Sequence, residues 1–360
     1  PSRPCDMSRS GAATIILAAA AIAGVGPADS PEALIGAGHF KRARARVEQR
    51  FASNPNEAES LWLMSWIRQI WGDRAAALDY AGKAVKLNGR DARYHLRLAE
   101  VLGESAQNAN VLEQFGLVAR FKKEIEATLA LDPGNVKALR HLMEYSLVAP
   151  SIAGGSHEKA AELAGRISRI DPVEGALAQA RMARHDRREE KLEEIYRKAV
   201  LAAPLNYDGH VALGNYYRSA TVKRFTEAER HGRIAVQLEP GSIDAYNLLA
   251  VTLAAQRKWS ELDEVLAQAE KQVPDNLAPY YRAASECLEL NTEFGRAERY
   301  LRRYLSVEPE PRSPTEAQAH RLLGQVNEKQ GRRGGARAEY RESVKLDPKS
   351  PAREDLHRLE

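Results

Sequence analysis

The sequence has few of the features that signal a disulfide-rich or cysteine-metal protein. Its 360 residues contain two cysteines, Cys5 near the beginning of the chain and Cys287 alone in the apolar stretch YYRAASECLEL. Two such cysteines provide neither an internal disulfide framework nor a cysteine-based zinc site. The apolar surroundings of Cys287 predict a buried, inert thiol, with a reactive thiol as the alternative.

An excess of one charge is also absent. The chain has 53 Lys and Arg against 49 Asp and Glu, which leaves a net charge of +4. This near-balance gives no reason to expect nucleic acid or an anionic membrane as a partner, since both require a one-sided basic surface. The composition, 44% hydrophobic and 28% charged, fits a folded soluble protein. At this length the chain needs several domains or a repeat architecture.

Catalytic motifs are missing as well. The segment HEKAA at 157–161 begins like a metalloprotease helix but has no second histidine, and no Gly-x-Ser-x-Gly occurs. The nine histidines are scattered singly, and His141 with Glu144 comes nearest to a metal-binding pair. We therefore predict no catalytic residue, no metal site, no cofactor and no enzymatic activity.

The N-terminal segment, residues 1–28, resembles an export signal. From Met7 it reads MSRSGAATIILAAAAIAGVGPADS, with Arg9 before an apolar run and small residues before Asp29. This pattern is typical of a secretory signal peptide and too short and alanine-rich for a membrane span. We expect a periplasmic or secreted protein with no stable membrane insertion of the mature chain. A buried alanine-rich helix or a retained anchor is the alternative.

Prolines recur with a period near 34 residues. Successive marker positions are separated by 32 to 44 residues, and Gly89 takes the place of one proline. Such a period, tolerant of local insertions, is typical of a helical repeat. The eight prolines are Pro55, Pro133, Pro172, Pro204, Pro240, Pro274, Pro309 and Pro348.

Two apolar rows precede each marker, at distances of twelve and eight residues. Because these rows are four residues apart, both point to one face of a helix. The marker then ends that helix, since proline cannot continue it. The first row is Ala43, Ala77, Phe121, Ala160, Leu192, Ala228, Leu262, Ala297 and Ala336, and the second is Val47, Ala81, Ile125, Ala164, Tyr196, Gly232, Leu266, Leu301 and Tyr340.

A second amphipathic segment lies before each of these helices and carries a small residue where two helices would cross. Clear examples are Gly214 in YDGHVALGNYYRS, Ala250 in IDAYNLLAVTLAAQ and Gly324 in AQAHRLLGQVNEKQ. Together these residues resemble the tetratricopeptide repeat, whose pattern has Leu-Gly and Tyr in the first helix and Ala, an aromatic residue and Pro in the second. Gly89, Phe121 and Leu262 depart from that pattern, as does Met143, which stands where a small residue is usual.

The resemblance implies an all-α fold, a right-handed α-solenoid of about eight to nine helix pairs. We expect the solenoid to occupy residues 29–348, beginning with an incomplete unit. Its period is broken by insertions at 104–116 and 149–156, which are either tolerated or help to form a binding surface. Residues 349–360 are expected to form a capping helix.

The resemblance also implies that the first helices line a concave surface. In that register Trp62 and Trp66 form an aromatic pair, which could anchor a peptide or pack beneath the N-terminal end. Arginine and asparagine side chains suit carboxylates and peptide backbones, although acidic residues fall on the same face. The remaining candidates for partner binding are Arg93, Arg140, Arg181, Asn215, Arg218, Asn247, Tyr281, Arg321 and Gln325.

These features predict a non-enzymatic scaffold that binds a protein or peptide in the bacterial cell envelope. A cytosolic adaptor of the same fold is the first alternative. A regulatory subunit of an envelope enzyme or of a polysaccharide-export complex is the second.

Overall fold

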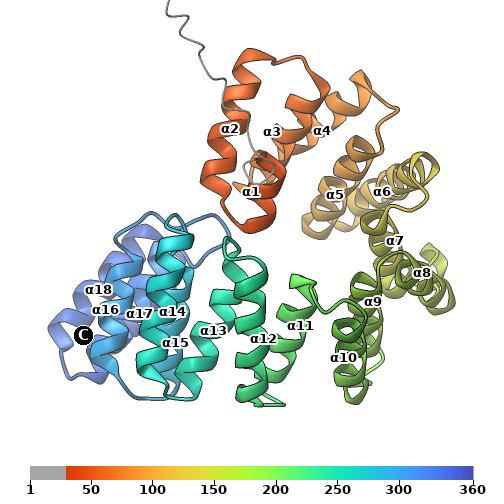
Figure 1. Ribbon diagram of the computed structural model, residues 1–360. Helices are drawn as coiled ribbons and strands as arrows, with labels where there is room; N and C mark the ends of the chain where they lie inside the picture. Colours follow the sequence, from red (N-terminus) through yellow and green to blue (C-terminus); the bar gives the residue numbers. More distant parts are fainter. Residues whose placement is uncertain (1–29, 360) are drawn as a thin grey trace, which may run out of the picture.

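The computed structural model describes residues 30–359, which form nineteen α-helices and no strand. The export-signal candidate lies outside these residues. The helices follow one another as nine pairs and a final single helix (Figure 1). The all-α repeat prediction is therefore confirmed. The first helices of the pairs are α1 (Pro31–Ala37), α3 (Ala58–Ile70), α5 (Ala92–Asn108), α7 (Val136–Val148), α9 (Pro172–His185), α11 (Tyr207–Arg218), α13 (Ile243–Ala255), α15 (Ala278–Glu289) and α17 (Glu316–Lys329).

The second helices carry the two predicted apolar rows. All nine residues of the first row are at most 8% exposed, and the second row is buried throughout. Each pair therefore buries its stripe against its neighbours, as a stacked repeat requires. These helices are α2 (Phe40–Ser53), α4 (Arg74–Leu87), α6 (Val111–Leu131), α8 (His157–Ile170), α10 (Leu192–Ala202), α12 (Phe225–Leu238), α14 (Trp259–Gln272), α16 (Phe294–Tyr304) and α18 (Arg333–Leu346).

Small residues are required where paired helices cross. A Cβ atom on Gly324 would lie 2.4 Å from the Tyr340 ring, and one on Gly214 would lie 2.5 Å from Leu248 Cδ2. Both distances are far inside van der Waals contact. Glycine at these positions therefore allows the close approach of α17 to α18 and of α11 to its neighbours.

The two insertions have different structures. Residues 104–116 lengthen α5 and α6 to 17 and 21 residues, so most of this insertion is helical. Residues 149–156 form a turn with a short 3₁₀ helix, η2 (Ser151–Ala153). This turn folds back on α7, where the Tyr145 hydroxyl donates to Ala153 O and Ser156 N donates to Ser146 O at 2.8 Å. A second 3₁₀ helix, η3 (Glu189–Lys191), precedes α10.

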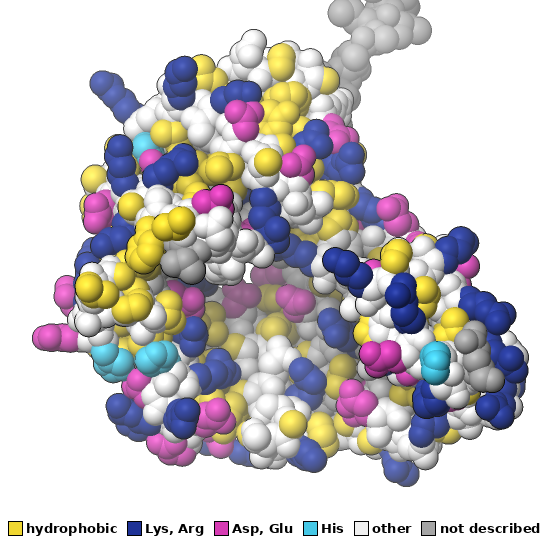
Figure 2. Space-filling model, turned by 180° about the vertical axis from the view of Figure 1, so that it is seen from behind, with side chains coloured by type: hydrophobic (Ala, Val, Ile, Leu, Met, Phe, Trp, Pro, Cys, Tyr) yellow, Lys and Arg dark blue, Asp and Glu magenta, His cyan; other side chains and the backbone are white. Residues whose placement is uncertain are grey.

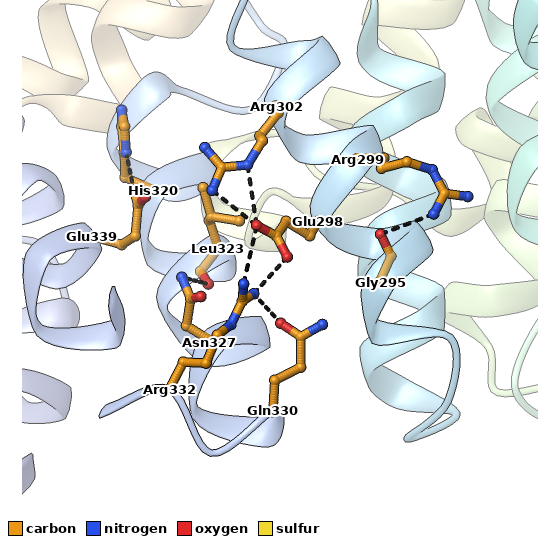
Figure 3. A network of polar contacts seen from close by, with 10 residues as sticks. All are labelled: Gly295, Glu298, Arg299, Arg302, His320, Leu323, Asn327, Gln330, Arg332 and Glu339. Carbon is orange, nitrogen blue, oxygen red and sulfur yellow. Dashed lines mark hydrogen bonds and ion pairs between the residues drawn. The ribbon is translucent and has the colours of Figure 1, made fainter. Parts of the chain in front are cut away.

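Polar contacts join the last units of the solenoid. Figure 3 shows Glu298 of α16 accepting hydrogen bonds from Arg302 of its own helix and from Arg332, just before α18. Hydrogen bonding by Arg332 lowers the pKa of Glu298 despite its partial burial. On α17, His320 Nδ1 lies 2.7 Å from the Glu339 carboxylate of α18. These contacts hold neighbouring helices in register around the apolar core.

The final helix covers the end of the solenoid. Helix α19 (Ala352–Leu359) buries Ala352 and Leu359 against Ala336 and Tyr340 of α18. The helix therefore has the position of the predicted cap. Across residues 30–359, no helix combines the length and apolar character needed to cross a bilayer.

The helix pairs curve round into a closed ring, so that the first pair contacts the C-terminal half (Figure 1). His39, between α1 and α2, places Nδ1 2.8 Å from an Asp275 carboxylate oxygen and Nε2 3.0 Å from Gly241 O. Lys41 N donates to Glu310 Oε2 at 3.0 Å. The start of the described chain is thus linked to turns that are more than 200 residues away in sequence.

Candidate binding pocket

A cavity of about 980 Å³ lies on the inner side of the N-terminal half. Its walls come from α1, α3, α5, α6 and α7, from the 149–156 turn, and from Arg312 in the turn before α17. Figure 2 shows the molecule from the side on which its interior is hollowed, with acidic and basic side chains on the walls. The first helices of three successive pairs therefore supply most of one concave site.

A buried arginine forms the polar floor of the cavity. Arg97 on α5 is 3% exposed and donates from Nε to Ser65 Oγ at 3.1 Å and from Nη2 to Ser65 O at 3.2 Å. It also donates to Gln69 and, at 2.9 Å, to Glu100. Burial lowers the pKa of Arg97 to about 10, which still leaves it charged at neutral pH. This guanidinium is satisfied by the protein and needs no ligand.

Glu100 completes this floor. Burial works to raise the pKa of Glu100, but His141 and Arg97 outweigh it and hold the pKa below its usual range. His141 Nε2 lies 3.7 Å from a Glu100 oxygen. The buried charges of the floor therefore pair with one another, so an incoming ligand would find its specificity at the walls and mouth.

Three aromatic side chains contribute to the walls of the cavity. Trp66 on α3 and Phe121 on α6 line the cavity together with Tyr145 on α7. The Phe121 ring lies 6.1 Å from the Tyr145 ring and 6.4 Å edge-on from the His141 ring. Such rings offer a large apolar surface in fixed positions.

The mouth carries exposed apolar side chains from both insertions and from the end of α7. Phe115 is 69% exposed, Val148 is 58% exposed and Ile152 is 97% exposed, and all three line the cavity. We refer to these three residues as the apolar lip. Figure 2 shows hydrophobic side chains gathered along the edge of the hollow formed by this part of the solenoid.

Other exposed large hydrophobic residues have a different distribution. Several stand singly at the ends of second helices, among them Leu87, Leu131, Ile170 and Leu346. Isolated exposed apolar residues are ordinary features of protein surfaces. The lip differs because its residues converge on one cavity.

The predicted tryptophan pair is present, with the two rings 5.1 Å apart. Trp62 is only 5% exposed and packs against Tyr94, whereas Trp66 is partly exposed and faces the cavity. Arg93 lies over the Trp62 ring and pairs with Asp91 at 2.7 Å. Of these three candidates, only Trp66 is placed to touch a ligand in the cavity.

Arg140 and Arg181 connect neighbouring first helices. Arg140 of α7 pairs with Glu174 of α9 at 2.9 Å, and Arg181 of α9 pairs with Glu144 of α7 at 3.2 Å. Arg140 and Glu144 also line the cavity. These reciprocal ion pairs hold α7 beside α9 and form one side of the site.

The other candidates lie on later first helices, outside this cavity. On α11, Arg218 donates to Asn215 at 3.3 Å, while Arg321 on α17 pairs with Asp355 of the capping helix at 2.7 Å. Tyr281 on α15 stacks near Tyr304, with ring centroids 5.5 Å apart. The structure therefore does not bring the eleven candidates together in one place. Asn247 lies on α13 and Gln325 on α17.

Sequence reasoning missed the lip, Arg97 of the floor and Arg312. Phe115 and Ile152 could have been selected, because each is a large apolar residue inside an insertion that breaks the period. The register used for the concave face did not select Arg97. Arg312 reaches the cavity only because the ring closes, which no local pattern indicates.

Residues 30–359 contain no group of three or more His, Cys, Asp or Glu side chains arranged to hold a metal ion. Cys287 is fully buried, and burial raises its thiol pKa to about 12. It therefore packs in the core as a protonated thiol, as its apolar surroundings predict.

The stacked helix pairs and their buried stripe define an α-helical repeat protein. A family model described as tetratricopeptide repeat matches residues 291–351, which run from just before α16 into the turn after α18. This part of the chain is similar to the tetratricopeptide repeat. Stacked helical repeats form extended concave surfaces that are suited to binding.

No curated protein sequence matches the chain. Among solved structures, a tetratricopeptide-repeat protein from Parabacteroides merdae is 13% identical, with 84% of this chain and 98% of that chain covered and a TM-score of 0.42. Pseudomonas aeruginosa pilF is 17% identical, with 62% and 99% covered and a TM-score of 0.40. Yeast Tom70 is 14% identical, with 91% and 79% covered and a TM-score of 0.45. At these values the similarities give no information about the partner of this chain.

Proposed function

We propose that the protein is a non-enzymatic scaffold that binds an apolar segment of a partner protein in the cavity behind the apolar lip. The observation that carries this proposal is the convergence on one cavity of Phe115 and Ile152, from two separate insertions, and of Val148 at the end of α7. Water-exposed apolar side chains gathered at a concave site are typical of a surface that a partner covers.

The size and chemistry of the cavity favour a short segment as the ligand. A volume of about 980 Å³ admits several side chains but not a folded domain. Covering each large lip side chain would contribute roughly 1.5–3 kcal/mol. The charged side chains of the floor already form ion pairs with one another. The bound segment therefore needs two or three spaced apolar residues rather than several charged residues.

The compartment is a separate part of the proposal. Its support is the sequence from Met7 to Ala28, which has the order of charge, apolar run and small residues of an export signal. We expect the mature protein to begin at Asp29 in the bacterial envelope. N-terminal sequencing of the protein purified from its native cell tests this, and an uncleaved Met7 start in the cytosol would contradict it.

Selection from a displayed random peptide library on the full-length chain tests the binding site. We expect enriched peptides to contain spaced apolar residues and to bind at least about tenfold more weakly to a Phe115→Ser, Ile152→Ser variant, because two apolar anchors are lost. The control is Leu201→Ser, Leu205→Ser, which alters side chains that are 77% and 81% exposed but outside the cavity. Equal binding to the parent and the lip variant would contradict the proposed site.

A further inference from the structure

The closure of the ring is unusual for stacked repeats. In a solenoid each repeat contacts only its neighbours in sequence. Here the turn between α1 and α2 contacts three turns of the C-terminal half, at residues 239–242, 273–277 and 305–315. We refer to the contacts of residues 39–41 with these turns as the clasp.

His39 is the central residue of the clasp. It is 5% exposed, and its two ring nitrogens face a carboxylate of Asp275 and the carbonyl oxygen of Gly241. One side chain thus ties two C-terminal turns to the start of α2.

The third turn contacts the two residues that follow His39. Lys41 donates through its backbone N to Glu310 and through Nζ to Glu308 O. The Arg312 guanidinium lies over the Phe40 ring, 5.6 Å from its centre. Arg312 has a φ of 72°, a left-handed conformation that a non-glycine residue rarely adopts. The surrounding contacts must therefore hold this turn in place.

The same turn belongs to the wall of the binding cavity. Arg312 lines the cavity together with Glu32 and Ile35 of α1. Separation of α1 and α2 from the C-terminal half would therefore move one side of the cavity away from the other. The clasp and the cavity share residues at their junction.

The clasp is polar, whereas the bodies that it joins have separate cores. Among the described residues, the apolar cluster around Leu34, Val47 and Trp62 contains no member of the cluster that runs from Ala235 to Val326. Opening would thus break hydrogen bonds and ion pairs without dividing an apolar core. Glu310 weakens the clasp, because its side chain is 2% exposed and its buried Oε1 has no hydrogen-bond partner.

We propose that the clasp is a gate that regulates access to the cavity. In the closed state, α1 and the Arg312 turn stand together at the junction and narrow the cavity. In the open state, α1 and α2 move away from the C-terminal half and admit the partner's segment. This inference rests on the proposed function for the identity of what enters, but the movement itself can be measured without a partner.

The variant that tests the gate is Asp275→Ala, Glu310→Ala in the full-length chain, since neither residue lines the cavity. Its matched control is Asp263→Ala, Glu270→Ala. This control removes two acidic partners of Arg296 and Arg303 between α14 and α16 and leaves the clasp intact. Circular dichroism establishes that both variants retain the helical fold.

Two measurements detect opening of the gate. Both use a Cys5→Ser background, in which the remaining cysteine, Cys287, is buried and is kept unreactive by its raised pKa. The first is the distance between spin labels at Ala45 on α2 and Gln268 on α14. The second is the alkylation rate of an Ile35→Cys thiol on the cavity wall by a bulky fluorescein maleimide. We expect longer, broader distances and alkylation at least about fivefold faster in the clasp variant, with the control like the parent.

Unchanged distances, or unchanged alkylation despite longer distances, would overturn the gate. Neither readout uses a peptide. Failure of the peptide selection would therefore count against the proposed function alone, and these measurements would still decide the gate.

Discussion

The two halves of this solenoid use one repeat in different ways. From α11 onward the units are regular, and a single apolar cluster runs from Ala235, near the end of α12, to Val326 on α17. Before α11 the core is divided among several clusters, both insertions interrupt the spacing, and the cavity with its exposed lip is found. Regular spacing produces a continuous core, whereas departures from it expose apolar side chains where a partner can reach them.

The largest expected difference in the free energy of unfolding is between substitution of a core residue and substitution of a residue of the apolar lip. Leu249→Ala on α13 removes a side chain that is 1% exposed and should lower the free energy of unfolding by roughly 2–5 kcal/mol. Phe115→Ala removes a larger side chain that is 69% exposed and should change it by less than about 0.5 kcal/mol. Urea unfolding followed by circular dichroism measures the free energy of unfolding of both variants. Similar decreases in the two variants would contradict the difference between the regular core and the exposed lip.

Substitution of two glycines tests whether close helix packing determines the residue type within the regular half. Gly324→Ala places a methyl group against the Tyr340 ring and should destabilise the protein by about 1–3 kcal/mol. Gly334→Ala lies on α18 with nothing within 4 Å of the new atom, so it should stabilise by up to about 1 kcal/mol through helix propensity. Thermal unfolding of the two variants should shift in opposite directions. A shift in the same direction would mean that close packing of α17 on α18 is not what requires Gly324.

A histidine pair in the first regular unit predicts a smaller, pH-dependent effect. His231 Nδ1 lies 2.9 Å from His210 Nδ1, and burial, followed by the charge of His210, lowers the pKa of His231 to about 4. The folded protein thus resists protonation of His231. The stability from this group is complete above the unfolded pKa of about 6.5 and is lost as the pH falls from there to about 4.

Because His231 is partly exposed to solvent, we expect the free energy of unfolding to fall by about 1–2 kcal/mol over this pH range. His231→Phe keeps an aromatic ring beside Tyr217, with which His231 is stacked, and should flatten the dependence of stability on pH over this range. Urea unfolding at a series of pH values measures the slope. The same slope in the parent and the variant would place the titrating group elsewhere.

Periodicity predicts the parts of the structure that depend on local contacts. Ala77 and Ala336 occupy the same place in distant units, and both are fully buried, because every second helix faces the same kind of neighbour. The end of the solenoid was also predictable, since an unpaired last unit needs a cover. Trp66 and Arg140 could be assigned to the concave side for the same reason.

The remaining features depend on distances that the repeat pattern does not contain. Nothing in residues 104–116 shows that they lengthen two helices and carry Phe115 to the mouth of a cavity. The contact of His39 with Asp275 depends on small rotations accumulated over several units. The repeat pattern of the sequence therefore predicts the helical scaffold and some residues of the cavity wall. It predicts neither the apolar lip nor the clasp.

The central claim is that a partner's apolar segment binds behind the lip. The most direct test places the photoreactive residue benzoylphenylalanine at position 115 of the full-length chain, with position 205, which is more exposed, as a control outside the cavity. A peptide selected on the parent chain is then crosslinked. The account predicts efficient crosslinking from position 115, competed by free peptide, and none from position 205. Crosslinking from position 205 alone, or equally from both, would contradict it.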